Sequence, residues 1–259
     1  MGNIDFSKST QYTLSIRLSA DGFSFTIHHP QSEDIHFMTY PTNPSYSMTA
    51  NIKKMLAVME ELKYPYQSIN ILIDTPRFIL VPFDIFEDEQ TETFFHLHFS
   101  PKENETILCN ILGKSNVAIL FGMDKHAHQL LAEQMPYARI YACVSPLLEY
   151  FTTKNREKST KNLYVHFHSD RMEVFAYDKG KLLITNTFSC KQTSDKVYYI
   201  LYIWKQLGFS QTKDHLYLAG NKNIQEELIT ELSKFIREIK PFPQKELIPF
   251  EIQTLIACE

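Results

Sequence analysis

Hydrophobic and polar residues alternate in the same way in two segments of the chain that lie 149 positions apart, Thr13 to Ile27 and Asn162 to Ala176. In each segment, apolar residues occupy every second position on both sides of a short turn with an aspartate, Asp21 or Asp170. This alternation predicts a strand, a turn and a second strand. The chain therefore contains one hairpin pattern twice. The matching positions are Leu14, Ile16, Leu18, Phe23 and Phe25 in one copy and Leu163, Val165, Phe167, Met172 and Val174 in the other.

The match continues with one helix and one further strand. Downstream of a third strand, Ile52–Leu62 and Val197–Leu207 both have the apolar spacing of a buried helix face, now at an offset of 145. A short apolar run follows each helix, at Ile69–Ile73 and Leu216–Ala219, and indicates a buried strand. Each half is therefore predicted to be β-β-β-α-β. Two ordinary amphipathic segments could match by chance, but the shared order, spacing and offset favour a duplication.

The rest of the chain contains further predicted elements. They are a strand at Phe78–Val81, a helix at Phe86–Phe99, a hairpin of Thr106–Leu112 and Val117–Gly122, a helix from Asp124 to Met135, a strand at Arg139–Cys143, a short helix at Ser145–Phe151, a helix that begins at Asn223 and a last strand at Phe250–Cys258. Ten residues without a large apolar side chain, Thr152–Lys161, mark the predicted boundary between two domains, where a hinge could lie.

Length and composition agree with two modest domains, because 259 residues with 44% apolar content can build two cores. The net charge is −4 and no long basic stretch occurs, so we expect no nucleic-acid partner. The first ten residues have no apolar core and predict no secretory signal. The longest apolar run, Val197 to Trp204, is far short of the roughly 20 residues of a membrane span. We expect a soluble cytoplasmic protein.

The four cysteines are widely scattered, at Cys109, Cys143, Cys190 and Cys258. No pair has the close spacing of a redox or zinc motif. Their neighbours are apolar or strand-like, so we expect small buried residues, with a reactive thiol as the less favoured alternative.

The order of these elements resembles the actin-like ATPase superfamily, which has a ribonuclease H-like α/β fold. Two halves that begin with three strands, a helix and another strand are the outline of that fold. The strand-Pro-strand-Pro-helix order from Ile69 to the helix after Pro82 is similar to its pilus-assembly branch. The whole chain, with Pro249-Phe250 and its Cys258-Glu259 ending, looks like a bacterial family called domain of unknown function 3822. This resemblance implies a duplicated actin-like fold of two lobes, 1–153 and 154–259, each with a mixed β-sheet flanked by helices.

The resemblance also indicates where a nucleotide would bind. Active members carry Asp-x-Gly near the end of the first strand of each half, where the acid holds metal or water and the glycine admits phosphate. The strand pattern places these motifs on Arg17-Leu18-Ser19 and His166-Phe167-His168. Both acids have become potential cations, and both glycines carry side chains. Asp21 and Asp170 lie in the turns, too late for the usual motif.

The turn that binds adenosine in active members has paired glycines, and here it matches Leu218-Ala219-Gly220-Asn221. It keeps one glycine, Gly220, while Asn221 could simply cap the next helix. The chain has only 7 glycines in 259 residues, against an average usage of roughly 7%. Loops that cradle phosphate need glycine, so the composition agrees with a loss of nucleotide binding.

His166, His168 and Asp170 form a His-x-His-x-Asp pattern. Alternate residues of a strand face the same side, so the three could supply metal ligands. The favoured interpretation is a polar face that opens onto the cleft between the lobes, and we therefore predict no metal site.

Two functions from different classes remain. The favoured one is a non-catalytic actin-like protein, a pseudo-ATPase that acts as a protein-interaction or scaffold module; its 19 Phe and 14 Tyr are useful at interfaces or simply buried. The alternative is a divergent nucleotide- or phosphometabolite-binding protein in which Arg17, His166 and His168 contact an anion directly. We predict no cofactor under the first hypothesis, and ATP with magnesium only under the second.

Overall fold

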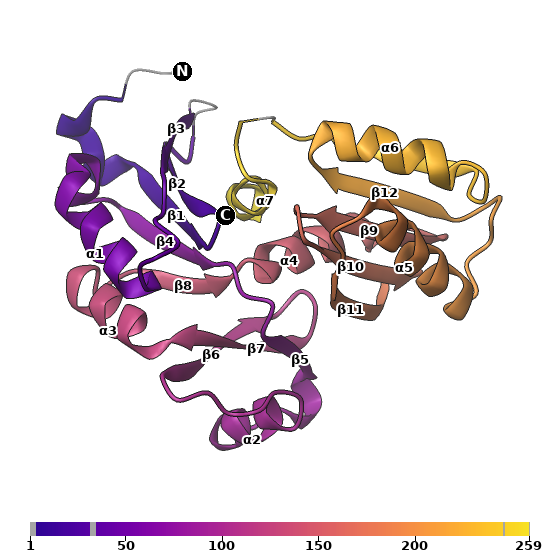
Figure 1. The fold of residues 1–259 in the computed structure, drawn as a ribbon, viewed down its shortest axis with the longest axis horizontal. Coiled ribbons are helices and arrows are strands. Elements are labelled where there is room, and N and C mark those ends of the chain that lie inside the picture. Colours follow the sequence, from indigo (N-terminus) through magenta and orange to yellow (C-terminus); the bar gives the residue numbers. More distant parts are fainter. Residues whose placement is uncertain (1–3, 32–34, 246, 259) are drawn as a thin grey trace. The chain divides into compact units, whose positions relative to one another are not determined.

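A computed structural model describes residues 4–31, 35–245 and 247–258. The chain divides into two compact units, one of Met1–Pro146 with Leu247–Ala257 and the other of Leu147–Glu246. The first unit thus ends before the predicted boundary at residue 153 and includes most of the C-terminal helix. Each unit is built on its own β-sheet (Figure 1).

The first unit contains a five-stranded sheet of order β3-β2-β1-β4-β8. Strands β1, β2 and β3 are antiparallel neighbours, whereas β4 and β8 extend the sheet in parallel from β1. The strands are β1 (Thr13–Ser19), β2 (Gly22–His28), β3 (Ile35–Tyr40), β4 (Ser68–Ile73) and β8 (Arg139–Ala142), and the helices are η1 (Phe6–Gln11), α1 (Met48–Val58), η2 (Glu60–Lys63), α3 (Lys125–Gln134) and α7 (Phe250–Cys258).

The two faces of this sheet differ in polarity although both are buried. Leu14, Ile16 and Leu18 of β1 lie on one face. Ser15 and Arg17 alternate with them and lie on the other face, because successive side chains of a strand point to opposite sides. Helix α7 covers this polar face: Leu72, the β4 partner of Arg17, packs with Ile252 and Leu255 of α7.

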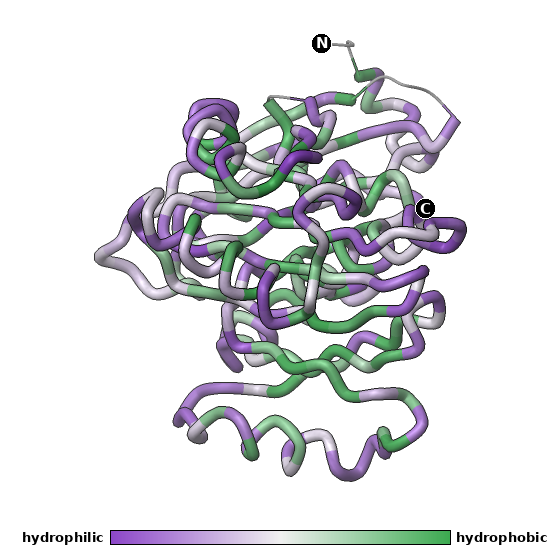
Figure 2. Tube along the Cα trace, turned by 90° about the vertical axis from the view of Figure 1, so that its right-hand side faces the viewer, coloured by the Kyte–Doolittle hydropathy of each residue, from purple (hydrophilic) through white to green (hydrophobic). Residues whose placement is uncertain are grey.

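A second, three-stranded sheet of order β5-β7-β6 belongs to the first unit. Its strands are β5 (Phe78–Pro82), β6 (Glu105–Leu112) and β7 (Val117–Asp124). Three short helices lie between β5 and β6, namely η3 (Phe83–Ile85), η4 (Asp88–Gln90) and α2 (Thr91–His96). The hairpin β6–β7 confirms the prediction. The helix predicted over 86–99 is much shorter, because the segment breaks into η4 and α2. This segment lies at the bottom of Figure 2, and it contains both hydrophilic and hydrophobic residues.

The second unit has a five-stranded sheet of order β11-β10-β9-β12-β13, the same topology as the first. The order β-β-β-α-β predicted for each half is confirmed, while descent by duplication stays a prediction from the sequence pattern. The strands are β9 (Lys161–Phe167), β10 (Arg171–Asp178), β11 (Lys181–Ser189), β12 (His215–Gly220) and β13 (Glu238–Pro241), and the helices are α4 (Val144–Asn155, which begins in the first unit), α5 (Thr193–Gln206) and α6 (Lys222–Leu232).

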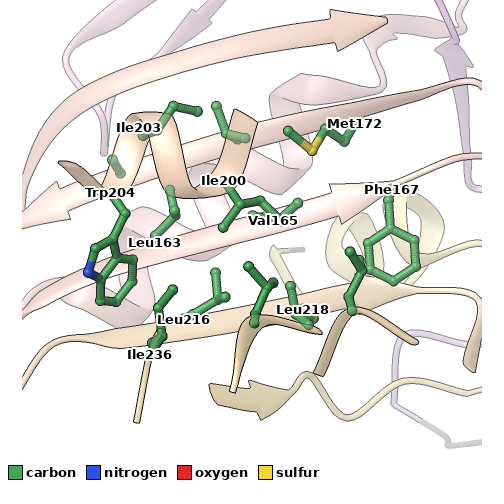
Figure 3. Packing of buried hydrophobic residues seen from close by; sticks show 14 of the residues in the cluster. Leu163, Val165, Phe167, Met172, Ile200, Ile203, Trp204, Leu216, Leu218 and Ile236 are labelled. Carbon is green, nitrogen blue, oxygen red and sulfur yellow. The ribbon is translucent and has the colours of Figure 1, made fainter. Parts of the chain in front are cut away.

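One face of the second sheet forms a hydrophobic core that is mainly aliphatic (Figure 3). Leu163 and Val165 of β9 pack there with Ile200 and Trp204 of α5. The opposite face is aromatic: the ring of Tyr164 stacks on Phe151 of α4, with centroids 4.4 Å apart. Since both faces are covered, every side chain of β9 after its first residue is buried.

Two sequence predictions at the ends of elements are wrong. Phe250–Cys258 forms helix α7 and not a strand; a short apolar run fits either element, and here Pro249 starts the helix by accepting the amides of Ile252 and Gln253. Helix α4 runs to Asn155, so the predicted connecting segment is helical at its start. Thr152 and Asn155 are buried there, and both side chains are hydrogen-bonded. Thr152 bonds to the Tyr177 hydroxyl, and Asn155 donates to the Phe151 carbonyl.

Helix α6 begins at Lys222, one residue earlier than predicted, and Asn221 caps it by accepting the amide of Asn223. The capping role proposed for Asn221 is thus confirmed. Among the residues that the structure describes, no helix combines the length and the hydropathy needed to cross a bilayer.

Candidate functional site

Arg17, at the first predicted motif, lies in the first unit inside a group of carboxylates. Its side chain is 8% exposed, and its Nη2 lies 3.0 Å from Asp74 Oδ2. Asp74 directly follows β4, which runs parallel to β1, so both strands bring their residues to the same end of the sheet. On the other side, Arg17 Nε lies 3.2 Å from Glu251 Oε1 on α7. A third carboxylate, that of the exposed Asp21, lies 3.2 Å from Nη1.

This arrangement fixes Arg17 as a cation. Burial by itself disfavours the charged guanidinium, but the negative charges of Glu251 and Asp74 outweigh burial and raise the pKa of Arg17. Ser19, the other polar residue of the motif, donates its hydroxyl to the same Asp74 Oδ2 at 2.6 Å. The guanidinium and the hydroxyl of the first motif are therefore both bound to carboxylates of the same unit.

The second motif, in the second unit, is built around Glu173. The antiparallel register of β9 and β10 places Glu173 directly opposite His166. His166 Nδ1 lies 2.9 Å from Glu173 Oε2, and His168 Nε2 lies 3.2 Å from the same oxygen. The carboxylate is 3% exposed. An ionised carboxylate only accepts hydrogen bonds, so both imidazoles donate to Glu173.

The two histidines keep Glu173 ionised. Burial alone raises the pKa of a carboxyl, but the positive charge of His168 and the hydrogen bonds from both imidazoles hold the pKa of Glu173 well below its usual range. The structure does not bring Asp170 into this group. Its side chain is 59% exposed and lies beside Arg171, with 3.5 Å between Arg171 Nη1 and Asp170 Oδ1. The acidic partner of the histidines is therefore Glu173, and not the Asp170 of the His-x-His-x-Asp pattern.

The predicted adenosine turn is occupied by a glutamine of the same unit. The Gly220 amide donates to Gln244 Oε1 at 3.2 Å, and the Gly220 carbonyl accepts from the side-chain amides of Gln244 and Gln225. Gly220 has φ +134°, and an added Cβ would lie 2.6 Å from the Phe167 carbonyl oxygen and 2.5 Å from its ring. Glycine is required here by the packing of Phe167, so its presence needs no nucleotide to explain it.

A hollow of about 480 Å³ opens in the first unit beside Asp74. Much of its polar lining is engaged internally. Arg77 forms a bidentate pair with Glu105, with both N–O distances 2.7 Å, and the Glu105 side chain lies where a Cβ on Gly122 would be. Asp124 caps α3 and accepts the Thr49 hydroxyl at 2.9 Å. The hollow thus offers no cluster of uncommitted cations for a phosphate among the described residues.

Two of the cysteines, Cys109 and Cys190, show no sign of an activated thiol. Cys143 and Cys190 are buried, whereas Cys109 and Cys258 are partly exposed. Burial, with a smaller effect of Asp88, raises the pKa of Cys109 to about 11, and burial also raises the pKa of Cys190. A thiol with a raised pKa is mainly protonated at neutral pH and is a weak nucleophile.

Four residues that complete these sites are missing from the sequence prediction. Two had a signal: Asp74 follows a predicted parallel strand, and Glu173 lies opposite His166 once the hairpin turn is fixed. Glu251 and Gln244 gave none, because each reaches its partner from far along the chain.

A family model described as "Protein of unknown function (DUF3822)" matches residues 2–239. A crystal structure of a protein with actin-like ATPase fold and unknown function, from Bacteroides thetaiotaomicron, is 42% identical to this chain, covers 100% of both chains and has a TM-score of 0.91. No functionally curated protein matches the chain significantly.

More distant structures share the fold at low identity. The PilM–PilN type IV pilus biogenesis complex has a TM-score of 0.55 at 10% identity, over 89% of this chain and 88% of the other. The ethanolamine utilization protein EutJ from Carboxydothermus hydrogenoformans has a TM-score of 0.50 at 8% identity, over 95% and 89%. These comparisons and the two five-stranded sheets give the chain an actin-like ATPase fold.

Proposed function

This chain belongs to the family of unknown function whose model it matches, and from that premise we propose that it is a non-catalytic actin-like protein, a pseudo-ATPase that serves as a protein-interaction or scaffold module. The observation that carries the proposal is the Arg17 cluster. A buried guanidinium lies where active members present an acid for metal, and carboxylates of the same unit neutralise it. A site of this kind has no charge left over for a phosphate.

The ATP and magnesium that this fold implies do not fit the residues present. Magnesium needs oxygen ligands, but the motif positions carry Arg17 and His166. Phosphate needs close approach to backbone amides, but Ser19 and His168 carry side chains in place of glycine. At the third position the Gly220 amide already donates to Gln244. We therefore derive no catalytic step for this chain.

A protein partner is supported by the surface and by the fold. Several large aromatic residues are exposed, among them Tyr137 at 92% and Tyr198 at 62%. Aromatic residues are enriched in the buried parts of interfaces. One structure of the same fold is a complex, that of PilM with PilN. A cytoplasmic location stays a prediction from the sequence.

A thermal-shift titration with ATP, ADP and common sugar phosphates, with and without magnesium, tests the proposal. We expect no saturable stabilisation of the wild-type protein by any of these compounds. The informative variants are Ser19→Ala and His166→Gln, each compared with the exposed control Tyr198→Ser. A saturable stabilisation that these two variants abolish and the control retains would overturn the proposal in favour of a divergent nucleotide- or phosphometabolite-binding protein.

A further inference from the structure

The segment from Phe83 to Phe99 covers one face of the three-stranded sheet. Its inner side is aromatic: Phe86, Phe94, Phe95 and Phe99 pack with the core of this sheet. Phe95 is fully buried, and Phe99 also lies against the Arg77 guanidinium at 4.7 Å. The sheet therefore holds this segment by one side only, and the other side faces outward.

The outward side carries large apolar residues that the rest of the described chain leaves uncovered. Phe83 is 48% exposed, Ile85 59% and Leu97 74%. Ile111 of β6 is 51% exposed and lies in the register row Val81–Ala118–Ile111, on the covered face of the sheet. The amide of Phe83 donates to the carbonyl of Asn116 in the β6–β7 turn, so Phe83 and Ile111 lie at the same end of this sheet.

The same segment carries five acidic residues, most of them between Ile85 and Leu97 in the sequence. Asp84, Glu87, Asp88, Glu89 and Glu92 are all exposed, and no lysine or arginine occurs between residues 78 and 101. No ion pair joins any of the five carboxylates to a basic side chain within the described part of the chain. The nearby β6–β7 turn adds Lys114. The surface is thus both apolar and strongly negative.

We propose that this surface, the acidic apolar ridge of Phe83, Ile85 and Ile111 with the five acids, docks a protein segment in which lysine or arginine alternates with apolar residues. The proposal rests on the protein-interaction function above and names the chemistry of the partner. Apolar side chains of the partner cover the ridge, while its cations pair with carboxylates that have no ion-pair partner in the described chain. The opposite charges of the ridge and a basic segment also speed their association, whereas an acidic segment is repelled.

Charge decides between this occupant and two others. An anionic lipid surface meets five like charges at the ridge and is repelled. A second copy that presents the same ridge brings acid against acid, which disfavours a two-fold contact. A basic amphipathic segment satisfies both the exposed apolar area and the charge, and it is the occupant that the ridge favours.

A labelled amphipathic helix peptide built from leucine and lysine is a suitable probe. Two control peptides accompany it, an acidic twin with glutamate for lysine and a scrambled peptide of the same composition. We expect saturable binding of the basic amphipathic peptide by fluorescence anisotropy at physiological ionic strength, weaker binding of the scrambled peptide and none of the acidic twin. A photo-crosslinking version of the probe is expected to label residues 83–97.

Matched variants locate the binding. Phe83→Ser with Ile85→Ser removes exposed apolar area and is expected to raise Kd at least about tenfold. Glu87→Lys with Glu89→Lys is expected to do the same. The control pairs are Tyr198→Ser with Tyr202→Ser, which are 62% and 50% exposed, and Glu133→Lys with Glu226→Lys. Circular dichroism melts check that every variant is folded.

Several results would overturn the inference. The ridge and control variants could have equal affinity for the peptide, or the crosslinks could lie outside the ridge. Binding of the wild type to anionic vesicles that the Phe83→Ser, Ile85→Ser variant loses would assign the ridge to a lipid surface. A wild-type dimer that the same variant dissociates would assign it to a second copy. The nucleotide titration is independent of all these outcomes. A protein that binds neither nucleotide nor peptide refutes the ridge and leaves the non-catalytic function standing.

Discussion

The two units place their motif residues at equivalent strand positions and neutralise them by different routes. In the first unit, Arg17 pairs with acids that come from the end of β4 and from α7. In the second, His166 pairs with Glu173 of the neighbouring strand in the same hairpin. Arg17 and His166 are 149 residues apart, as are their strand partners Ser24 and Glu173. The strand position of the basic residue is common to both units, and the source of its acidic partner is not.

This difference teaches that the charge balance of each motif depends on its own unit. A hairpin contact forms as soon as its two strands pair, whereas the Arg17 cluster also requires the last helix of the chain to return to the first sheet. The first site is therefore expected to be lost with α7, whereas the pairing of His166 with Glu173 lies within one hairpin.

The largest effect is expected for Arg17→Met. The change leaves Asp74 and Glu251 as buried carboxylates without their cation, and breaking a buried pair in this way costs about 3–5 kcal/mol of the free energy of unfolding. Urea denaturation measures it. Addition of Glu251→Gln to Arg17→Met is expected to recover part of the loss. A cost below about 1 kcal/mol for Arg17→Met would show that the cluster is not closed as described.

Gly220→Ala is expected to cost about 2–3 kcal/mol, because the new methyl group meets the Phe167 carbonyl and ring. The equivalent position in the first unit is Ile73, since Ile73 pairs with Leu18 as Gly220 pairs with Phe167. Ile73→Ala is the control, and it tests ordinary loss of packing. If Gly220→Ala is neutral in thermal and urea denaturation, steric need does not explain this glycine.

Glu173→Gln is expected to cost about 1–3 kcal/mol, less than Arg17→Met. The substitution keeps the shape of the side chain, and its amide oxygen can still accept a hydrogen bond from an imidazole. Double-mutant cycles with His166→Gln measure the coupling across the hairpin. A coupling energy near zero would contradict the shared carboxylate seen in the structure.

The pH dependence of stability follows from the same carboxylate. The pKa of Glu173 lies well below its ordinary value of 4.5 in the folded state. Its stabilising contribution is therefore fully present above pH 4.5 and is lost as the pH falls through the lower folded pKa. Below pH 4.5, the urea midpoint of the wild type is expected to fall more steeply than that of Glu173→Gln. Parallel pH profiles for the two proteins would contradict this assignment.

The smallest effect is expected for Asp21→Asn. Asp21 contacts Arg17, but its side chain is 67% exposed, and exposed ion pairs contribute at most about 1 kcal/mol. Comparison with Asp74→Asn, whose side chain is 4% exposed, separates the two acids of this cluster. A cost for Asp21→Asn equal to that for Asp74→Asn would show that burial does not set their contributions.

Periodicity predicted the strands well because their environment is simple. Leu14, Ile16 and Leu18 alternate with polar residues, so β1 could be placed from its own sequence, and β9 likewise. The same alternation located Arg17 and His166 at equivalent positions. The strand register, extended across the hairpin turn, also places Glu173 opposite His166, because this pairing is local.

The partners of Arg17 and Gly220 could not be predicted in the same way. Glu251 is 234 residues from Arg17 and lies on α7, whose apolar sequence fits a strand as well as a helix. Gln244 reaches Gly220 from an irregular segment after β13. In both cases the contact depends on the tertiary structure, and no short-range sequence pattern predicts it.

Isothermal titration calorimetry of the wild-type protein with ATP and magnesium tests the central claim most directly. Because the charges and amides at all three motif positions are engaged within their own units, we predict no saturable heat of binding up to millimolar nucleotide, which is far above ordinary nucleotide affinities. A saturable isotherm at equimolar stoichiometry, weakened by His166→Gln and unchanged by Tyr198→Ser, would contradict it.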